Sequence, residues 1–313
     1  MASILFLAPA DLGETVLATG ALAHVLSEGD AVTVLASPES APLFRAVPGL
    51  VAARAVATDA GIAQHWRAWM ELARARYDLV IDGRGGFLGR AMPAARRVAL
   101  KPPAHLRHLS EDWAEAVGAE RALPKLWLDD AARAGAAKTA PEGARLLLLA
   151  PGGAAEAKRW PGERYAAVAR RLADGPLVGA RILVLGAARR DAAITRAIVS
   201  SLDADGVAAT DLGEGCDLLT AAALAERATL CIGNDNALTH IAAAMAAPTL
   251  TLFGPTDERV RAPVGPRTRT LRGRSFEAAA TLAPLDARAA MEDVSIDAVE
   301  AAALDLLHAG GLR

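Results

Sequence analysis

The chain has 313 residues, a length that suits two domains of about 150 residues each. Hydrophobic residues make up 53% of it and charged residues 22%, a balance that excludes a disordered protein. The formal net charge of −2 at pH 7 argues against electrostatic attraction of the whole protein to nucleic acid, so we expect no nucleic-acid partner. Two cysteines are too few for a disulfide framework or a zinc site.

The first half of the chain alternates between predicted strands and helices. Apolar runs predict strands at residues 4–7, 31–35 and 79–81. An apolar stripe predicts a helix over residues 14–26, and residues 58–77 also carry helical spacing. Strands that alternate with helices indicate βαβ units and a parallel sheet.

The second half repeats this pattern after a change of composition. Residues 129–144 are rich in Ala and Gly, and we predict that they link two domains. Further strands are predicted at residues 146–149, 182–185, 229–232 and 249–253. Ser295 is a candidate N-cap for a final amphipathic helix. The simplest fold class is α/β, with two Rossmann-like, doubly wound parallel-sheet domains that face a cleft.

Gly13 and Glu14 follow the first predicted strand. Gly13 would allow a tight turn, and Glu14 would enter the first helical turn with its carboxylate near the sheet edge. A carboxylate in that place can act as a general base toward a hydroxyl group. The helix dipole alone also favours an acidic residue in a first turn, so a structural role is the alternative.

A glycine-rich loop follows the strand predicted at residues 146–149. The N–H groups of Gly152 and Gly153 can approach a phosphate closely, and Lys158 supplies a cation just before a helix that Pro161 can start. The loop lacks the spacing of an ATPase P-loop. It is therefore either a phosphate cradle or an ordinary loop with solvated basic side chains.

Several polar residues follow the strand predicted at residues 229–232. Asp235 can accept hydrogen bonds from sugar hydroxyls, and N–H groups near Asn236, Ala237 and Leu238 can meet a diphosphate at a helix N-terminus. The polar residues could equally serve as helix caps. His240, one turn inside the helix, could be a structural residue.

Six arginines follow a Gly-Pro-Thr turn at residues 254–256. They could attract an anionic substrate, or they could lie on the solvated face of an edge strand. The six are Arg259, Arg261, Arg267, Arg269, Arg272 and Arg274.

These motifs, in order along the chain, resemble those of glycosyltransferase family 9, the bacterial heptosyltransferases. NDNALTHIAAA at residues 234–244, followed by FGPT at residues 253–256, is similar to the family's nucleotide-sugar motif. The family's Lys-x-Trp-Pro block stands at residues 158–161, and its N-terminal pattern resembles Asp-Leu-Gly-Glu at residues 11–14. YDLVIDGRG at residues 77–85 looks like the family's Y-D-x-V-I-D-x-Q-G.

The resemblance implies the GT-B fold, with an acceptor-binding domain at residues 1–138 and a nucleotide-sugar-binding domain at residues 139–313. The C-terminal helix, residues 295–313, could pack back on the N-terminal domain. The implied reaction is an inverting transfer of a heptose, or a related sugar, from ADP-heptose to a lipopolysaccharide core or other glycan acceptor. It needs neither a metal nor another cofactor.

The resemblance also assigns roles by position. Glu14 would deprotonate the acceptor hydroxyl, and Lys158 would neutralise charge on the departing ADP. The helix N-terminus near Ala237 and Leu238 would hold the diphosphate, and Asp235 would bind the donor sugar. Gly13, Gly152, Gly153, Asn236 and His240 complete the expected substrate-binding set, and Arg84 is a candidate contact for acceptor anions.

No stretch of about 18 uninterrupted apolar residues is present. We therefore expect a cytoplasmic protein, with at most peripheral contact at the cytoplasmic face of the inner membrane.

Two residues depart from the family pattern. Glu14 stands where the family usually has Asp, and Ala237 stands where it prefers Gly. One extra methylene moves a carboxylate by about 1 Å, and a misplacement of that size can cost about a hundredfold in rate. Two alternatives therefore stay open. One is a family member with a different donor or acceptor, and the other, which these departures motivate, is a catalytically degenerate nucleotide-binding protein.

Overall fold

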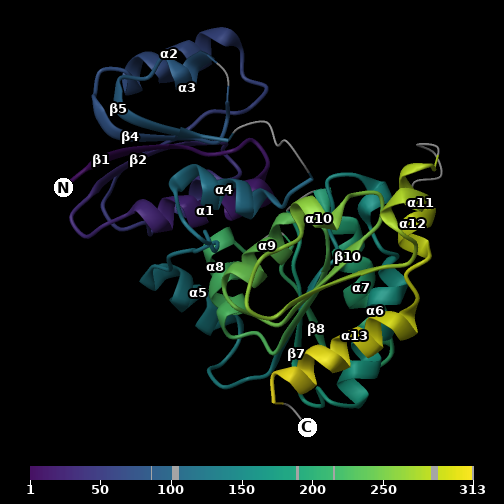
Figure 1. The fold of residues 1–313 in the computed structure, drawn as a ribbon. Helices are drawn as coiled ribbons and strands as arrows, with labels where there is room; N and C mark the ends of the chain where they lie inside the picture. Colours follow the sequence, from purple (N-terminus) through teal and green to yellow (C-terminus); the bar gives the residue numbers. More distant parts are fainter. Residues whose placement is uncertain (86, 101–105, 188–189, 214–215, 283–287, 312–313) are drawn as a thin grey trace. The chain divides into compact units, whose positions relative to one another are not determined.

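The computed structural model describes residues 1–85, 87–100, 106–187, 190–213, 216–282 and 288–311. The chain divides into two compact units, Met1–Asp129 and Asp130–Arg313. Each unit contains one parallel sheet that is covered by helices (Figure 1). The predicted fold class, two Rossmann-like α/β domains, is therefore confirmed.

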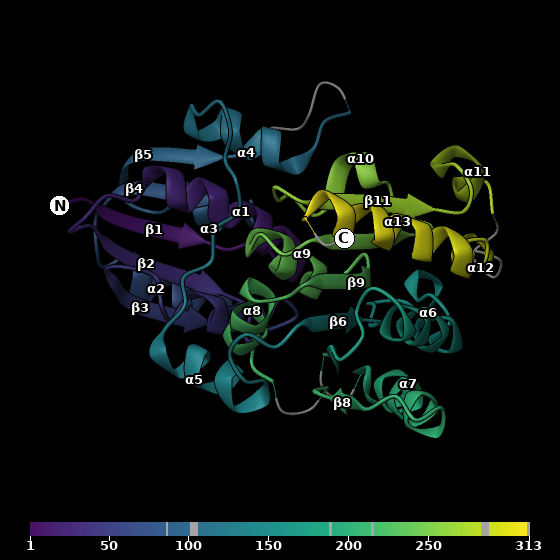
Figure 2. The same cartoon turned by 90° about the horizontal axis from the view of Figure 1, so that it is seen from below.

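The first unit has a five-stranded sheet in the order β3-β2-β1-β4-β5, and all neighbouring strands are parallel. Figure 2 shows these strands side by side. Helices α2 and α3 lie on one face, and α1 and α4 lie on the other (Figure 1). The strands are β1 (Ser3–Leu7), β2 (Ala31–Ala36), β3 (Leu50–Ala55), β4 (Tyr77–Asp82) and β5 (Ala94–Ala99). The helices are α1 (Leu12–Val25), α2 (Ile62–Leu72), α3 (Phe87–Arg90) and α4 (Leu109–Val117), with a 3-10 turn η1 (Ala41–Phe44).

Burial explains which strands of this sheet the sequence predicts. Ile4, Leu5 and Phe6 of the central strand β1 are at most 1% exposed, so both of its faces need apolar side chains. The edge strands β3 and β5, with the sequences LVAARA and AARRVA, are largely exposed, and the sequence does not predict them. Their arginine and alanine residues leave no apolar run to recognise.

The second unit has a six-stranded sheet in the order β11-β10-β9-β6-β7-β8, again entirely parallel. The strands are β6 (Leu146–Ala150), β7 (Arg181–Val184), β8 (Ala209–Asp211), β9 (Leu230–Asn234), β10 (Thr249–Phe253) and β11 (Thr268–Arg272). The helices are α5 (Asp130–Thr139), α6 (Gly162–Asp174), α7 (Ala192–Ala204), α8 (Leu218–Glu226), α9 (Ala237–Ala244), α10 (Glu258–Arg261), α11 (Phe276–Ala280), α12 (Ala289–Glu292) and α13 (Ile296–Ala309), with a 3-10 turn η2 (Glu156–Lys158).

Helix α5 corrects the prediction of a linker at residues 129–144. It packs on α8, and a Cβ atom at Gly135 would lie 2.8 Å from Oγ1 of Thr220. Small residues permit this close approach, so the low content of large apolar residues reflects a helix–helix contact. The two units divide before α5, whereas the predicted boundary at residues 138 and 139 falls at its end.

Helix α13 packs on α6 and β11 of its own unit. Ser295 caps it as predicted, because its hydroxyl accepts a hydrogen bond from the N–H group of Ala298. Val299, Ala303 and Leu307 contribute to a buried core shared with β6, β9 and β10. Across the described ranges, no helix is long and apolar enough to cross a membrane.

Candidate active site

Polar groups from three segments converge on Asp235 at the carboxyl end of β9. Its Oδ2 accepts a hydrogen bond from Oγ1 of Thr256 at 2.8 Å and lies 3.2 Å from Nζ of Lys158. Its Oδ1 lies 3.9 Å from Nε2 of His240. The structure thus brings together three predicted site residues and adds Thr256, which the FGPT motif could have identified. We call these four residues the Asp235 cluster.

The surroundings of Asp235 favour its charged form. The side chain is 9% exposed, and burial alone would raise the pKa of this carboxyl group. His240, Lys158 and Thr256 outweigh burial and lower the pKa of Asp235 from 3.8 to about 2. Asp235 is therefore an ionised hydrogen-bond acceptor at neutral pH.

Asn234 joins the glycine-rich loop to β9. Its Nδ2 donates to the carbonyl groups of Pro151 and Gly152, at 2.6 and 3.2 Å. Its Oδ1 accepts from the backbone N–H of Trp160 at 3.2 Å and the hydroxyl of Tyr165 at 2.8 Å. Asn234 belongs to the predicted polar motif but not to the expected substrate-binding set, and it is fully buried. It fixes the loop beside the Asp235 cluster without facing solvent.

Arg159 also supports this loop. Its guanidinium donates to the carbonyl of Gly153 at 2.9 and 3.2 Å and pairs with the buried Asp191 at 3.0 Å. A Cβ atom on Gly152 would lie 2.2 Å from a carboxylate oxygen of Asp191, so the loop needs glycine at that position. Of the two adjacent basic residues, Lys158 therefore contacts the Asp235 cluster and Arg159 holds the loop.

Helix α9 begins beside the cluster, and Asn236 is its N-cap. The Oδ1 of Asn236 accepts from the N–H groups of Leu238 and Thr239, and its Nδ2 donates to the carbonyls of Ala150 and Gly152. The side chain of Asn236 is thus used within the protein, as the capping alternative predicts. The cap does not use the N–H group of Ala237, the first helical residue. First-turn N–H groups lack acceptors within the helix and can bind an anion.

His240 lies inside α9 and is 4% exposed. Its Nε2 lies on the side of Asp235, whereas its buried Nδ1 has no hydrogen-bond partner among the described residues. His240 therefore contributes to the electrostatic environment of the carboxylate rather than to helix capping.

Arg272 holds the turn that carries Thr256. One of its terminal nitrogens donates to the carbonyls of Gly254 and Thr256, both at 2.7 Å. Its guanidinium also lies 3.3 Å from Glu258 and stacks over the ring of Phe276. Because Thr256 bonds to Asp235, Arg272 indirectly supports the cluster.

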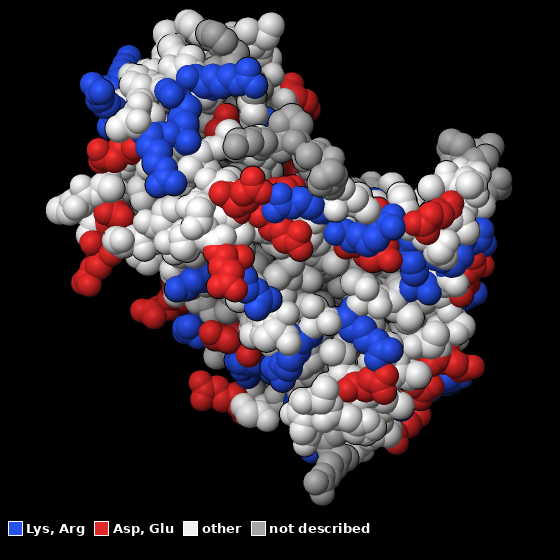
Figure 3. Space-filling view, viewed as in Figure 1, with Lys and Arg blue, Asp and Glu red and all other residues white. Residues whose placement is uncertain are grey.

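Most of the other predicted arginines form surface ion pairs. Arg269, on the edge strand β11, pairs with Asp305, and Arg274 pairs with Asp293. Arg259 pairs with Asp257 at 2.9 Å. On the face drawn in Figure 3, basic and acidic side chains of the second unit interleave. The edge-strand interpretation therefore describes Arg269 and its neighbours better than an anion-binding surface.

Glu14 lies in the first turn of α1, as predicted, and is half-buried. Asp11 is the N-cap, and its carboxylate accepts from the N–H group of Glu14 at 2.9 Å. Gly13 does not form the predicted tight turn, because it is already the second residue of the helix. The chain changes direction at Asp11, whose backbone is extended.

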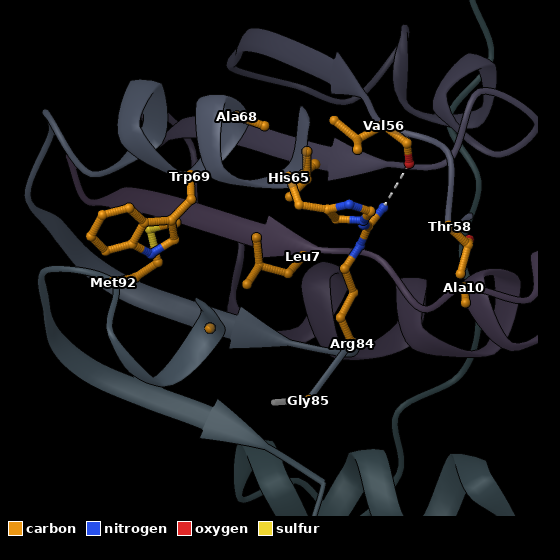
Figure 4. A pocket seen from close by; sticks show the side chains of 12 residues that line it. Leu7, Ala10, Val56, Thr58, His65, Ala68, Trp69, Arg84, Gly85 and Met92 are labelled. Atoms are coloured by element: carbon orange, nitrogen blue, oxygen red, sulfur yellow. Dashed lines mark hydrogen bonds between the residues drawn. The ribbon is translucent and has the colours of Figure 1, made fainter. Parts of the chain in front are cut away.

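Arg84 follows β4 and lines a cavity in the first unit (Figure 4). Its Nε donates to the carbonyl of Ala8 at 3.1 Å, and its Nη2 donates to that of Val56 at 3.5 Å. Burial lowers the pKa of Arg84, and the charge of Asp82 opposes this effect only in part. The side chain is thus a partly buried cation fixed by main-chain carbonyls.

In the part of the chain that the structure describes, no three His, Cys, Asp or Glu side chains are grouped so that they could hold a metal ion.

Comparison with protein families assigns the chain to a family. The family model of glycosyltransferase family 9 (heptosyltransferase) matches residues 89–287, more than half of the sequence. The protein belongs to this family of glycosyltransferases. No curated protein matches the sequence.

Solved structures confirm the GT-B fold. The chain is similar to the ADP-heptose lipopolysaccharide heptosyltransferase II of E. coli, with 18% identity, a TM-score of 0.76 and coverage of 99% of both chains. A family 9 glycosyltransferase from Veillonella parvula DSM 2008 gives 18% identity, a TM-score of 0.79 and 98% of both chains. The E. coli heptosyltransferase WaaC with ADP-2-deoxy-2-fluoro heptose gives 17% identity and a TM-score of 0.70, with coverage of 96% of this chain and 98% of that chain.

Proposed function

We propose that the protein is an inverting glycosyltransferase that moves a heptose, or a related sugar, from ADP-heptose to a lipopolysaccharide core or other glycan acceptor. The observation that carries the proposal is the Asp235 cluster beside the N-terminus of α9. An ionised carboxylate accepts hydrogen bonds from sugar hydroxyls, while an ammonium group and helix N–H groups bind a diphosphate. Membership of family 9 supports a sugar donor of this class.

In the proposed mechanism the donor lies on the second unit. Lys158 and the first N–H groups of α9, at Ala237, bind the diphosphate and stabilise the charge that develops on ADP as it leaves. The glycine-rich loop at Gly152 and Gly153 borders the same site. Asp235 accepts hydrogen bonds from the donor sugar and orients its reacting carbon.

The acceptor hydroxyl loses its proton to Glu14 and attacks the anomeric carbon. The new bond forms on the face opposite the diphosphate, so the configuration inverts, and ADP leaves with the electron pair of the broken bond. Because Lys158 and the helix N-terminus supply positive charge to ADP, the scheme needs no metal ion. A lipopolysaccharide core acceptor is held at a membrane, so we propose that the protein acts in the cytoplasm with at most peripheral contact with the inner membrane.

Thermal unfolding in the presence of ADP, UDP, GDP or NAD tests the donor assignment. A ligand at a hundred times its Kd stabilises the folded state by about 2.7 kcal/mol, so a selective nucleotide raises the unfolding midpoint. We expect ADP to give the largest shift. Lys158→Gln should weaken the binding of ADP by about tenfold, because it removes a positive charge from the diphosphate site.

Lys138→Gln is the matched control, since Lys138 is an exposed lysine on α5 of the same unit. It should leave the ADP shift unchanged. A preference for NAD, or an ADP shift that Lys158→Gln does not alter, would contradict the proposal.

A further inference from the structure

The first unit contains a cavity of about 340 Å³ between α2 and the sheet, and it reaches the carboxyl end of β4 at Arg84 (Figure 4). Its wall is mainly apolar, with Leu7 from β1, Val56 after β3, Trp69 from α2 and Met92 before β5. The volume is within the range of about 300–1,000 Å³ that is typical of small-molecule sites. A group the size of a substituted benzene ring would contact apolar side chains on several sides.

Arg84 places one positive charge in this apolar wall. Two of its nitrogens donate to main-chain carbonyls, and within the described ranges no carboxylate lies at ion-pair distance from its guanidinium. The carboxylate of Asp82 instead accepts from the backbone N–H groups of Arg84 and Gly85. The family pattern that residues 77–85 resemble has the neutral glutamine at this position. A partly buried cation without a paired anion favours a ligand that brings one.

The other polar groups of the cavity restrict the charge of that ligand. Nδ1 of His65 donates a hydrogen bond to the carbonyl of Gly61 at 3.4 Å. Thr58 lines both this cavity and an adjoining open hollow of about 530 Å³. Glu39 and Asp59 line the hollow and make it acidic. One guanidinium next to an acidic hollow suits a monoanion better than a dianion.

We propose that the cavity binds a carboxylate that has a compact apolar or aromatic body, with the carboxylate at Arg84 and the body against Leu7, Val56 and Trp69. The inference rests on the proposed function, because such a group would belong to the acceptor. The acceptor of this protein then carries, besides the hydroxyl that receives the sugar, an acidic group with an apolar portion.

Isothermal titration calorimetry, in which 3-phenylpropanoate is added to the full-length protein, tests the inference. We expect saturable binding of 3-phenylpropanoate. The affinities for 3-phenylpropanamide, which lacks the charge, and for inorganic phosphate, which lacks the apolar body, should be at least about tenfold lower. Arg84→Gln should weaken the binding of 3-phenylpropanoate by a similar factor. Arg96→Gln, which neutralises an exposed arginine on β5 outside the cavity, should have no effect.

A second variant locates the ligand independently of charge. Ala68 lines the cavity from α2, so Ala68→Phe should fill the space and abolish binding although Arg84 remains. Unchanged binding of 3-phenylpropanoate by either Arg84→Gln or Ala68→Phe would overturn the inference. Equal binding of the amide or of inorganic phosphate would overturn it as well.

Measurement of the ADP shift on the same samples separates this inference from the proposed function. Arg84→Gln and Ala68→Phe should retain the full shift, which also shows that the variants are folded. Binding of ADP without binding of 3-phenylpropanoate by the wild type would refute the carboxylate site alone. Binding of 3-phenylpropanoate without ADP would support the site and refute the donor assignment.

Discussion

Replacing Asp235 with asparagine keeps the shape of the side chain and removes its charge. In the folded protein burial opposes that charge, but His240, Lys158 and Thr256 lower the pKa of Asp235 from 3.8 to about 2. At about 1.36 kcal/mol per pKa unit, this shift corresponds to about 2 kcal/mol of folding free energy. Because the pKa of Asp235 is lower in the folded than in the unfolded protein, the stabilisation is present above pH 3.8 and is lost as the pH falls through about 2.

Urea unfolding of the wild type and Asp235→Asn, from neutral pH down to about pH 3, measures this effect. We expect the wild type to be more stable by about 2 kcal/mol at neutral pH and the difference to shrink with acid. Asp203→Asn, at an exposed aspartate of α7 in the same unit, should change stability by no more than about 0.5 kcal/mol. A difference that is independent of pH, or no difference at neutral pH, would refute the reasoning.

Two further substitutions test how the site is held. Asn234→Ala leaves a buried hydroxyl and a buried carbonyl without their partner, so we expect calorimetry to show a loss of about 3 kcal/mol. A loss below about 1 kcal/mol would contradict this role. Gly152→Ala would place a Cβ atom 2.2 Å from Asp191 and should cost about 1–3 kcal/mol in urea unfolding. At Gly61, where an added Cβ meets nothing within 4 Å, the same change should cost less, and an equal cost would argue against a steric cause.

The central strands of both sheets could be predicted from the sequence, because burial on two faces imposes an apolar run. Strands β1 and β6 are examples. The edge strands β3 and β5 could not, since exposure frees them from that requirement. Helix α5 resembles a linker in composition because its contact with α8 needs small residues, which also occur in linkers.

The site shows the same division between local and long-range signals. Lys158, Asp235 and His240 could be predicted because each follows a strand in a motif of polar residues. The role of Asn234 depends on partners from a distant loop and helix, which the sequence does not reveal. Residue type alone does not separate Lys158 from Arg159, and only the family resemblance selects Lys158. In the fold, Arg159 pairs with Asp191 and Lys158 with Asp235.

Release of ADP from ADP-heptose, measured with a lipopolysaccharide core acceptor, tests the central claim most directly. The wild type should release ADP in step with sugar transfer, and Glu14→Gln should reduce the rate by about a hundredfold or more, because it removes the general base. Glu28→Gln, at an exposed acid beyond the end of α1, should leave the rate unchanged. Equal rates for Glu14→Gln and the wild type, or no release of ADP by the wild type, would contradict the account.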